Sequence, residues 1–351
     1  MQVTPSLRNN VRLAKAKRNY LDTALCQRTT ASYNTGVNAF SIFCVLHDVD
    51  FIKADWVGSE DTMVYFVCYL ADTKMLAHST IKSYLAGVRN YCIKNSLEYP
   101  FVRYNGQPML QLKLVLRGIK KSRTPKALLR LPVTADIMLR FFELLNSNVF
   151  IGEYERLLMK AALSIAYFGF LRCGEFTTHT NKFDPEVNLC LGDVVIDNSN
   201  PQEAYITLKA SKTDPFRCGV TVSYFKVNSP IDPVQNIHKF MRERSRYATD
   251  QMMPLFLFQD FTHLTRDRFL KRLHDLCNLS GIQGKNYSGH SFRRGSATAA
   301  FRCGIDKELI KWQGDWASDA WERYVELDKS QKSALPKALV AEAAAAEGFA
   351  M

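Results

Sequence analysis

An imidazole and a guanidinium meet at the expected start of a helix in segment 289–297, Gly-His-Ser-Phe-Arg-Arg-Gly-Ser-Ala. His290 precedes this helix, and Arg293 enters its first turn. The free N–H groups of a helix amino terminus attract anions, so the pair suits a phosphate group. A His-x-x-Arg pattern alone is weak evidence, because His290 would serve equally well as a helix-capping side chain.

Arg172 is a second cation in an unusual setting, since it follows a strongly apolar segment, Ala-Tyr-Phe-Gly-Phe-Leu at 166–171. A buried charge without a partner is costly. Either the nearby Glu175 or an anionic ligand must therefore compensate this charge. Pairing with Glu175 alone is the simpler alternative.

Lys212 is a third candidate cation. It lies in the loop 211–214, between two expected strands, where its side chain can reach away from the sheet. An ordinary loop lysine would look the same, and Lys209, on the preceding strand, is a rival for any chemical role.

Two aromatic residues follow the His-x-x-Arg segment. Trp316 comes after a helix that Gly314 is expected to stop. Tyr324 lies on the next helical segment, which Ser318 or Asp319 can cap. Packing in the core is the ordinary alternative for both side chains.

The elements that must hold these residues fall into two groups, of which residues 21–121 form the first, a helical domain. Ser59 and Ser79 can each cap a helix in which apolar residues recur at three- and four-residue intervals. Further helices are expected near 30–47 and 109–121. The apolar stripes, expected to be core, are Met63, Phe66, Val67 and Leu70, and Ile81, Leu85, Val88 and Cys92.

Residues 134–332 predict a second domain, helical with a small insertion of strands. The pattern favours an α+β class, mainly α with a small antiparallel β-sheet, over an alternating βαβ array. The Ala-rich tail, 333–351, can form a last helix. Strands are expected at 187–196, 203–210 and 219–225, and helices at about 134–146, 153–170, 233–246, 266–280, 292–303, 306–312 and 318–328.

Charge is distributed unevenly along the chain. The 351 residues carry a net charge of +12, and residues 1–130 alone hold 19 basic and 8 acidic residues. This asymmetry favours a nucleic acid as partner over a basic surface kept for solubility. Residues 1–20 are expected to form a basic arm, and 122–133 a basic linker marked by Pro125 and Pro132. The residues expected to contact the nucleic acid are Lys82, Arg89, Arg117, Lys120, Lys121, Arg123 and Lys126.

Composition disfavours several other classes of protein. Hydrophobic residues make up 47% and charged residues 23%, which excludes global disorder. No apolar run is long enough for a membrane helix, and the first ten residues are too polar for a signal peptide, so we expect neither a membrane nor a secreted protein. Nine widely spaced cysteines without a Cys-x-x-Cys predict buried reduced thiols, not disulfides or a zinc site. Phosphate-loop, dinucleotide, zinc-protease and serine-hydrolase motifs are absent.

The order of the candidate residues resembles the catalytic set of the tyrosine recombinase, or phage-integrase-like, family. The phrases Gly-Phe-Leu-Arg-Cys-Gly-Glu, Gly-His-Ser-Phe-Arg-Arg-Gly and Asp-Ala-Trp-Glu-Arg-Tyr are most similar to mobile-element recombinases of the DIRS or Crypton type, and the resemblance spans about 30–330. Many relatives have Gly-His at the fifth position, with the histidine nine residues before the nucleophile, where this chain has Asp315. Other members use a tryptophan, as at Trp316, and many have a histidine where this chain has Arg294. The six matching positions are Arg172, Lys212, His290, Arg293, Trp316 and Tyr324.

The resemblance implies a covalent 3′-phosphotyrosine intermediate in DNA, and the residue types suit this chemistry. Arg172 and Arg293 present planar forks for the two non-bridging phosphate oxygens. His290 and Trp316 can donate further hydrogen bonds to these oxygens, and Asp315 is the alternative at the fifth position. These fixed charges stabilise the transition state in place of a metal ion.

The remaining roles concern proton transfer and orientation. Tyr324 is the implied nucleophile; a phenol has an ordinary pKa of about 10, and surrounding cations favour its ionised form. Lys212 is expected to protonate the departing 5′ oxygen. Glu175 is expected to orient Arg172.

The family implies a core-binding domain at 21–121 followed by a catalytic domain at 134–332, acting on double-stranded DNA as a homotetramer across two sites. No cofactor, metal or membrane is implied. A nuclear location is expected for a eukaryotic protein. Two alternatives stay open, namely a DNA-binding protein that has lost catalysis and a type IB topoisomerase.

Overall fold

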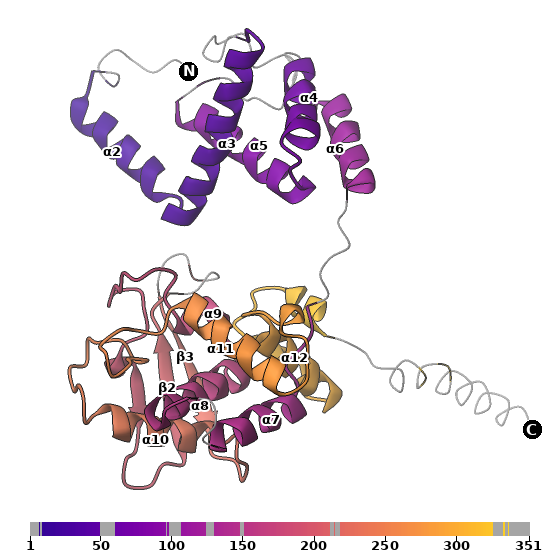
Figure 1. Cartoon of the computed structure of the whole chain (residues 1–351). Helices are drawn as coiled ribbons and strands as arrows, with labels where there is room; N and C mark the ends of the chain where they lie inside the picture. Colours follow the sequence, from indigo (N-terminus) through magenta and orange to yellow (C-terminus); the bar gives the residue numbers. More distant parts are fainter. Residues whose placement is uncertain are drawn as a thin grey trace, which may run out of the picture. The chain divides into compact units, whose positions relative to one another are not determined.

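The structure is a computed structural model that divides into two compact units, Met1–Ala127 and Leu128–Met351 (Figure 1). The division falls within the expected linker, 122–133. The residues that the structure describes are 7, 9–49, 60–95, 97, 107–123, 130–147, 151–210, 214, 218–325, 333 and 336.

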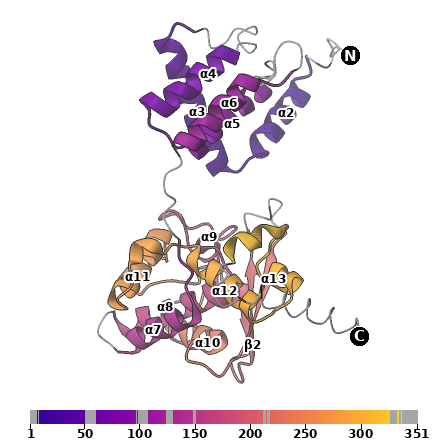
Figure 2. The ribbon, with the colours of Figure 1, turned by 90° about the vertical axis from the view of Figure 1, so that its right-hand side faces the viewer.

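Unit 1 is helical in its described residues. The expected basic arm, 1–20, overlaps a helix with no buried residue, and the other helices contribute to one core. The elements are α2 (Val11–Thr23), α3 (Gln27–Leu46), α4 (Glu60–Cys68), the π-helix η2 (Tyr69–Thr73), α5 (His78–Lys94) and α6 (Leu110–Ser122). The α-helices among them are labelled in Figures 1 and 2.

The two apolar stripes predicted for this unit are confirmed, since all eight residues are at most 7% exposed. The predicted cap at Ser79 is wrong. Helix α5 begins at His78, and the carbonyl of Ala77 accepts the hydrogen bonds of the first turn, so Ser79 lies inside the helix. Ser59 lies outside the described residues. The α6 amino terminus is capped from a distance, because the Glu60 carboxylate accepts from the N–H groups of Gln111 and Leu112 at 2.6 and 3.1 Å.

Helices α3 and α5 approach each other at a pair of glycines. A Cβ atom on Gly36 would lie 2.6 Å from the Cα of Tyr84, and one on Gly87 would lie 2.4 Å from the carbonyl oxygen of Tyr33. No L side chain fits at such distances. The two backbones therefore touch directly, which fixes the position of α5 in the unit.

Unit 2 is mainly helical with one small sheet, so the predicted fold class is confirmed. Its central helix is α8 (Glu153–Phe168), which packs against α7 (Ala135–Asn146), α10 (Pro233–Arg244) and α12 (Ser291–Arg302). The other helical elements are α9 (Cys173–Phe176), η3 (Leu191–Asp193), α11 (Arg266–Leu279), η4 (Gly284–Asn286), α13 (Lys307–Gln313) and η5 (Asp319–Tyr324).

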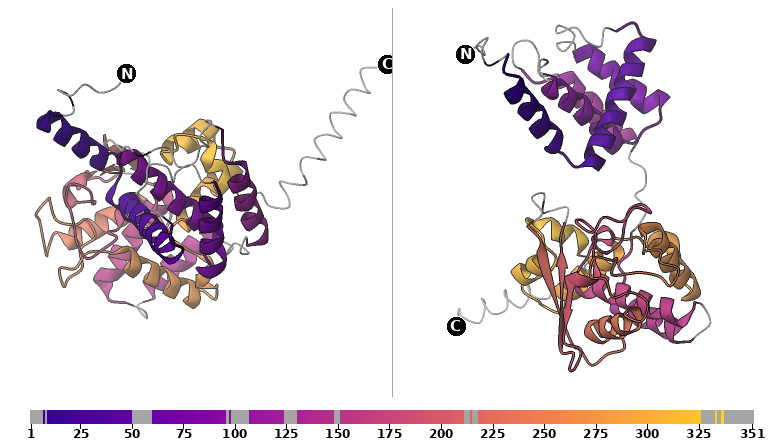
Figure 3. Two further views of the ribbon diagram at one scale, coloured as in Figure 1. Left: turned by 90° about the horizontal axis from the view of Figure 1, so that it is seen from above. Right: turned by 90° about the vertical axis from the view of Figure 1, so that its left-hand side faces the viewer.

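The sheet is antiparallel, in the order β1 (Val194–Ile196), β2 (Glu203–Leu208) and β3 (Val220–Phe225), and it packs against α10 (Figure 3). The first strand is shorter than the predicted 187–196. The backbone around Leu189–Leu191 pairs instead with the distant segment 253–255, before η3 turns the chain into the sheet.

Two other predictions need correction. The segment 318–328 was expected to form an α-helix, but its described part is the short 3-10 helix η5, and the side chain of Ser318 makes no capping hydrogen bond. The cysteines are all free, but Cys26, Cys218 and Cys303 are exposed, so the expectation that all are buried is wrong. The tail, 333–351, lies outside the described residues except at two isolated positions. Among the described helices, none has the length and apolar character that a bilayer crossing requires.

Candidate functional site

Arg293 is the centre of the candidate site. Its side chain is almost completely buried, with the residue 1% exposed. The Nη1 atom donates to the carbonyl oxygen of Phe170 at 2.6 Å, and Nη2 donates to the carbonyl oxygen of Gly314. The guanidinium carbon lies 3.7 Å from the centre of the Trp316 ring. Arg293 is thus fixed by backbone acceptors and by an aromatic face.

The first of these acceptors is the end of α8. Gly169 closes the helix, Phe170 adopts a left-handed conformation with φ of 51°, and the N–H of Leu171 bonds back to the carbonyl of Ala166. This is the Schellman type of helix ending. It turns the Phe170 carbonyl out of the helix and toward Arg293.

The second acceptor is the end of α13, which has the same design. Gly314 closes this helix, Asp315 is left-handed with φ of 48°, and the N–H of Trp316 bonds back to the carbonyl of Lys311. Two helix carboxyl termini therefore direct partial negative charge at one guanidinium. Gly314 is required here, because a Cβ atom on it would lie 1.8 Å from the Trp316 ring.

The charged and titratable groups that shift the pKa of Arg293 include other candidate residues of the site. Burial and the positive charge of Arg172 lower the pKa of Arg293 to about 10, while Glu175, Tyr324 and Asp315 act in the opposite direction. Arg293 remains a cation at neutral pH. Its Nε–H is buried and has no hydrogen-bond partner among the described residues, and such a donor is costly unless a ligand satisfies it.

Arg172 is held by Glu175, as predicted from the charge of both residues. The Glu175 carboxylate accepts from the backbone N–H of Arg172 at 2.7 Å and from its Nη1 at 2.6 Å. The pair is partly buried, with side-chain exposures of 15% and 7%. Helix α9 is too short to hold this geometry alone, so the ion pair itself fixes the direction of the guanidinium.

His290 is brought to the same region by a glycine contact. A Cβ atom on Gly289 would lie 2.4 Å from the Cβ of Cys173, so the chain before α12 rests on the residue that follows Arg172. His290 is exposed at the amino terminus of α12, and its ring does not cap that helix. The alternative that the His290 side chain caps α12 is therefore wrong.

Tyr324 ends η5 and is half-buried. Its carbonyl accepts from the hydroxyl of Thr298 at 2.9 Å. The ring lies 5.9 Å from the Trp316 ring at an angle of 48°, and 6.0 Å from the guanidinium carbon of Arg294. Within the described part of the chain, no hydrogen bond occupies the Tyr324 hydroxyl.

Trp316 separates the buried cation from the phenol. Its ring is stacked on Arg293 on one side and tilted against Tyr324 on another, and the residue is 8% exposed. We had expected a hydrogen-bond donor at this position. The structure gives the indole a further task, because it supports both reactive side chains.

The two candidate lysines differ in what the structure describes. The ammonium group of Lys209 is held by three neighbouring groups. Its Nζ lies 2.9 Å from the Asp193 carboxylate, 2.8 Å from the carbonyl of Pro185 and 3.2 Å from the Cys190 sulfur. This argues against Lys209 as a mobile proton donor. Lys212 lies outside the described residues.

The basic residues of unit 1 lie on α5 and α6. Lys82 and Arg89 are both exposed, seven residues apart on α5, as are Arg117, Lys120 and Lys121 on α6. Burial and the charges of Lys82 and Lys120 lower the pKa of His78, so both lysines lie near this imidazole.

The remaining two residues expected to contact DNA are Arg123 and Lys126. The side chain of Arg123 pairs with the Asp72 carboxylate and the Ala71 carbonyl in its own unit and is partly exposed. Lys126 lies outside the described residues.

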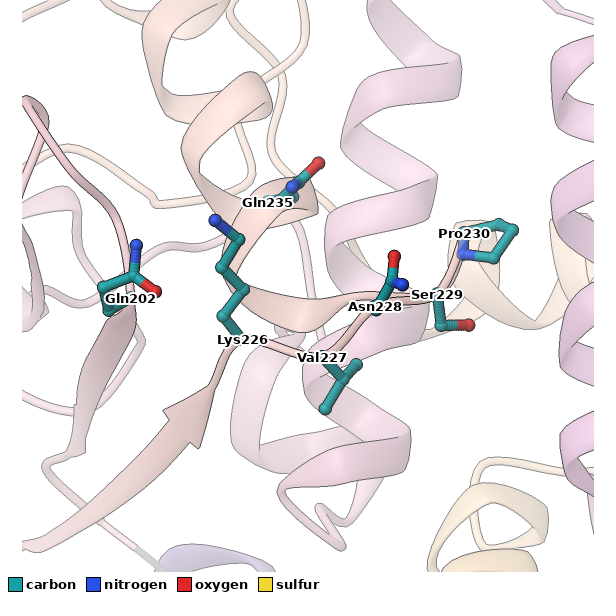
Figure 4. Close-up of a pocket in the computed structure, with 7 residues that line it drawn as sticks. All are labelled: Gln202, Lys226, Val227, Asn228, Ser229, Pro230 and Gln235. Atoms are coloured by element: carbon teal, nitrogen blue, oxygen red, sulfur yellow. The ribbon is translucent and has the colours of Figure 1, made fainter.

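A pocket elsewhere in unit 2 contains none of these side chains. It is lined by Gln202, which precedes β2, by residues 226–230, which follow β3, and by Gln235 on α10 (Figure 4). Its lining is uncharged apart from Lys226, and we assign no chemistry to it.

Comparison with solved structures identifies the fold. The XerH site-specific recombinase bound to palindromic difH substrate is 17% identical, covers 79% of this chain and 69% of its own, and gives a TM-score of 0.55. The chain has the tyrosine recombinase fold. The Tn1549 transposon integrase in complex with transposon right-end DNA (12% identity, 80% and 85% coverage, TM-score 0.51) has this fold too. So does a lambda integrase dimer bound to a core site (14%, 90% and 96%, 0.50). No family model and no curated protein sequence matches the chain.

Several residues of the site were not predicted from the sequence. The carbonyl groups of Phe170 and Gly314 have no side-chain signature, and Thr298 looked like an ordinary helix residue. One signal was available. The two helices that point at Arg293, α8 and α13, each end in a glycine followed by a left-handed residue, and these glycines, Gly169 and Gly314, are visible in the sequence.

Proposed function

We propose that the chain is a site-specific DNA recombinase that breaks and rejoins strands through a 3′-phosphotyrosine at Tyr324, and that it serves a mobile genetic element. The observation that carries the proposal is the convergence of Arg172, from just after the end of α8, with Arg293, Trp316 and Tyr324, from the last third of the chain. The tyrosine recombinase fold supports it, and the three comparison structures are each described as complexes with DNA.

The phosphate would be bound mainly by the two arginines. Arg293 keeps N–H groups that its carbonyl partners do not use, including the buried Nε–H, and Arg172 presents the edge of its guanidinium that Glu175 does not occupy. Two cations at a phosphodiester offset its negative charge and the charge that builds up in the transition state. This arrangement needs no metal ion.

The cleavage step uses the phenol as nucleophile. The Tyr324 oxygen gives up its proton and bonds to phosphorus, and the bond between phosphorus and the 5′ oxygen breaks. We assign His290 as the group that takes the phenolic proton and Lys212 as the group that protonates the departing oxygen. The products are a 3′-phosphotyrosyl bond and a free 5′-hydroxyl, so the phosphoester bond is exchanged and not lost.

Rejoining follows from this balance. A 5′-hydroxyl from another strand can attack the phosphotyrosine and release Tyr324 without ATP. Exchange between two DNA sites requires four active sites, which is why we propose a homotetramer. Unit 1 is assigned to DNA binding through the exposed cations of α5 and α6, and the nucleus is the proposed location in a eukaryotic host.

The direct test is covalent capture of DNA. A pool of nicked duplexes with a randomised centre, in which the short cleaved fragment diffuses away, traps the enzyme on its site. The wild-type protein should form an adduct that survives denaturation, maps to Tyr324 by mass spectrometry and reveals the site by sequencing. Tyr324→Phe should bind DNA and form no adduct. An adduct that persists in this variant would contradict the assignment of the nucleophile.

Plasmids with and without the captured DNA site then distinguish a recombinase from the two alternatives. A plasmid with two copies of the site should yield recombinant products. Relaxation of a supercoiled plasmid that lacks the site would indicate a type IB topoisomerase. Binding without any adduct from the wild-type protein would indicate a DNA-binding protein that has lost catalysis.

A further inference from the structure

Helix α12 carries a second arginine directly after the one that centres the site. Arg294 is half-buried, and its guanidinium carbon lies 6.0 Å from the centre of the Tyr324 ring. This distance is at the outer limit of a cation–π interaction. Unlike Arg293, which faces the helix ends, Arg294 faces the phenol.

The same face of α12 also holds the backbone of Tyr324. Thr298 lies one turn after Arg294, so the two side chains are neighbours on the helix surface. The Thr298 hydroxyl donates to the Tyr324 carbonyl at 2.9 Å, and Thr298 is 2% exposed. One helix face therefore contacts both the main chain and the ring of the nucleophile.

Trp316 provides the remaining support for the ring. It lies 5.9 Å from Tyr324 and is itself stacked on Arg293. The η5 helix has only six residues and 3-10 geometry, so it does not fix the ring by itself. The orientation of the phenol depends on these side-chain neighbours.

We propose that Arg294 is a positioning residue that holds the Tyr324 ring in line with the scissile phosphate. The inference rests on the proposed function of the site. A cation over the ring face restricts the phenol to one orientation before DNA arrives, and orientation of a nucleophile contributes directly to rate. Arg294 does not contact the reacting atoms in this assignment.

The test compares three variants with the wild type. Arg294→Met removes the charge and keeps the length, Arg294→Lys keeps the charge, and Arg302→Met is the matched control on the same helix. The rate of adduct formation is measured in a single turnover on saturating captured duplex, beside the dissociation constant. Arg294→Met should slow adduct formation about 2- to 30-fold with unchanged binding, the range that cation–π energies allow. Arg294→Lys should form the adduct at a rate between those of Arg294→Met and the wild type. Arg302→Met should form it at the wild-type rate.

A modified duplex distinguishes positioning from leaving-group assistance. With sulfur in place of the bridging 5′ oxygen, the leaving group departs as a thiolate and needs no proton. The Arg294→Met defect should persist on this duplex, because a misplaced nucleophile is not repaired by a better leaving group. Recovery of the wild-type rate would assign Arg294 to the leaving group and overturn the proposal. A loss of affinity that accounts for the whole effect would make it a phosphate contact and overturn it too.

Hydrogen exchange supplies a readout that does not depend on catalysis. In the DNA-free protein, amides of 316–325 should exchange faster in Arg294→Met than in the wild type or Arg302→Met. If Arg294→Met showed both wild-type hydrogen exchange and a wild-type rate of adduct formation, the positioning role would be refuted and the proposed function would stand. A wild-type protein that forms no adduct on any duplex would refute the proposed function, and the positioning role with it.

Discussion

Cations are held in opposite ways in the two units. In unit 1, Lys82 and Arg89 are exposed on α5. In unit 2, Arg293 is 1% exposed and fixed by two carbonyl groups and an indole ring. Exposed charges contribute to affinity one at a time and are screened by salt. A buried, oriented charge acts on one transition state, and its removal leaves unsatisfied partners.

The largest expected effect is that of Arg293→Met. This variant removes the oriented cation and leaves the carbonyls of Phe170 and Gly314 without their donor. Adduct formation on the nicked duplex should fall by about 10²–10³-fold or more, as for loss of a fixed transition-state donor. Arg293→Lys should recover little, because an ammonium group cannot bridge both helix ends.

The control for Arg293 is a buried arginine outside the site. Arg244 is 0% exposed and donates to the carbonyls of Ala248, Pro254 and Leu255. Arg244→Met should lower the free energy of unfolding by about 1–3 kcal/mol, a cost expected of Arg293→Met as well. Folded Arg244→Met should cleave at the wild-type rate. Equal rate losses in the two variants would mean that Arg293 acts only through stability.

Glu175→Gln is expected to have an intermediate effect. The amide keeps the shape of the carboxylate but weakens its bond to the Arg172 guanidinium. We expect a decrease of about 10–100-fold in the rate of adduct formation, the usual result of removing a group that orients a catalytic one. DNA affinity should change little. A wild-type rate would show that α9 alone directs Arg172.

Smaller effects are expected from removal of the exposed cations of unit 1. Lys82→Ala and Arg89→Ala should each weaken DNA binding several-fold and reduce the slope of log affinity against log salt by about 1. The single-turnover rate on saturating DNA should not change. Lys74→Ala, a change of exposed charge elsewhere in unit 1, is the matched control. Equal salt slopes in all three variants would remove α5 from the DNA-binding surface.

Removal of divalent metal should have the smallest effect of all. Because the proposed site supplies fixed guanidinium charges to the phosphate, EDTA should leave the rate of adduct formation unchanged. A rate that falls in EDTA and returns with Mg²⁺ would contradict the assignment of transition-state charge to Arg172 and Arg293.

Much of the fold could be predicted from periodicity, because amphipathic segments such as α6, α7 and α10 carry a strong pattern. The errors lie where distant segments decide local structure. The residues before β1 pair with 253–255, and the start of α5 is stabilised by a backbone carbonyl instead of a serine side chain. Neither partner leaves a mark in the local sequence.

The candidate site, like the fold, could be predicted only in part. Arg172 with Glu175, Arg293 and Tyr324 could be selected by residue type and order, since charge in an apolar setting is visible in the sequence. The geometry of their support could not. Backbone carbonyls exist at every position, so nothing distinguished those of Phe170 and Gly314 before the helix endings were known.

The two helix endings at Arg293 also link the site to folding. The contact with Phe170 joins residues 123 positions apart, and that with Gly314 joins residues 21 apart. Contacts of such different range form together only when the unit is essentially native. A nascent or damaged chain therefore lacks the oriented charge, so the proposed cleavage of DNA would depend on completed folding of unit 2.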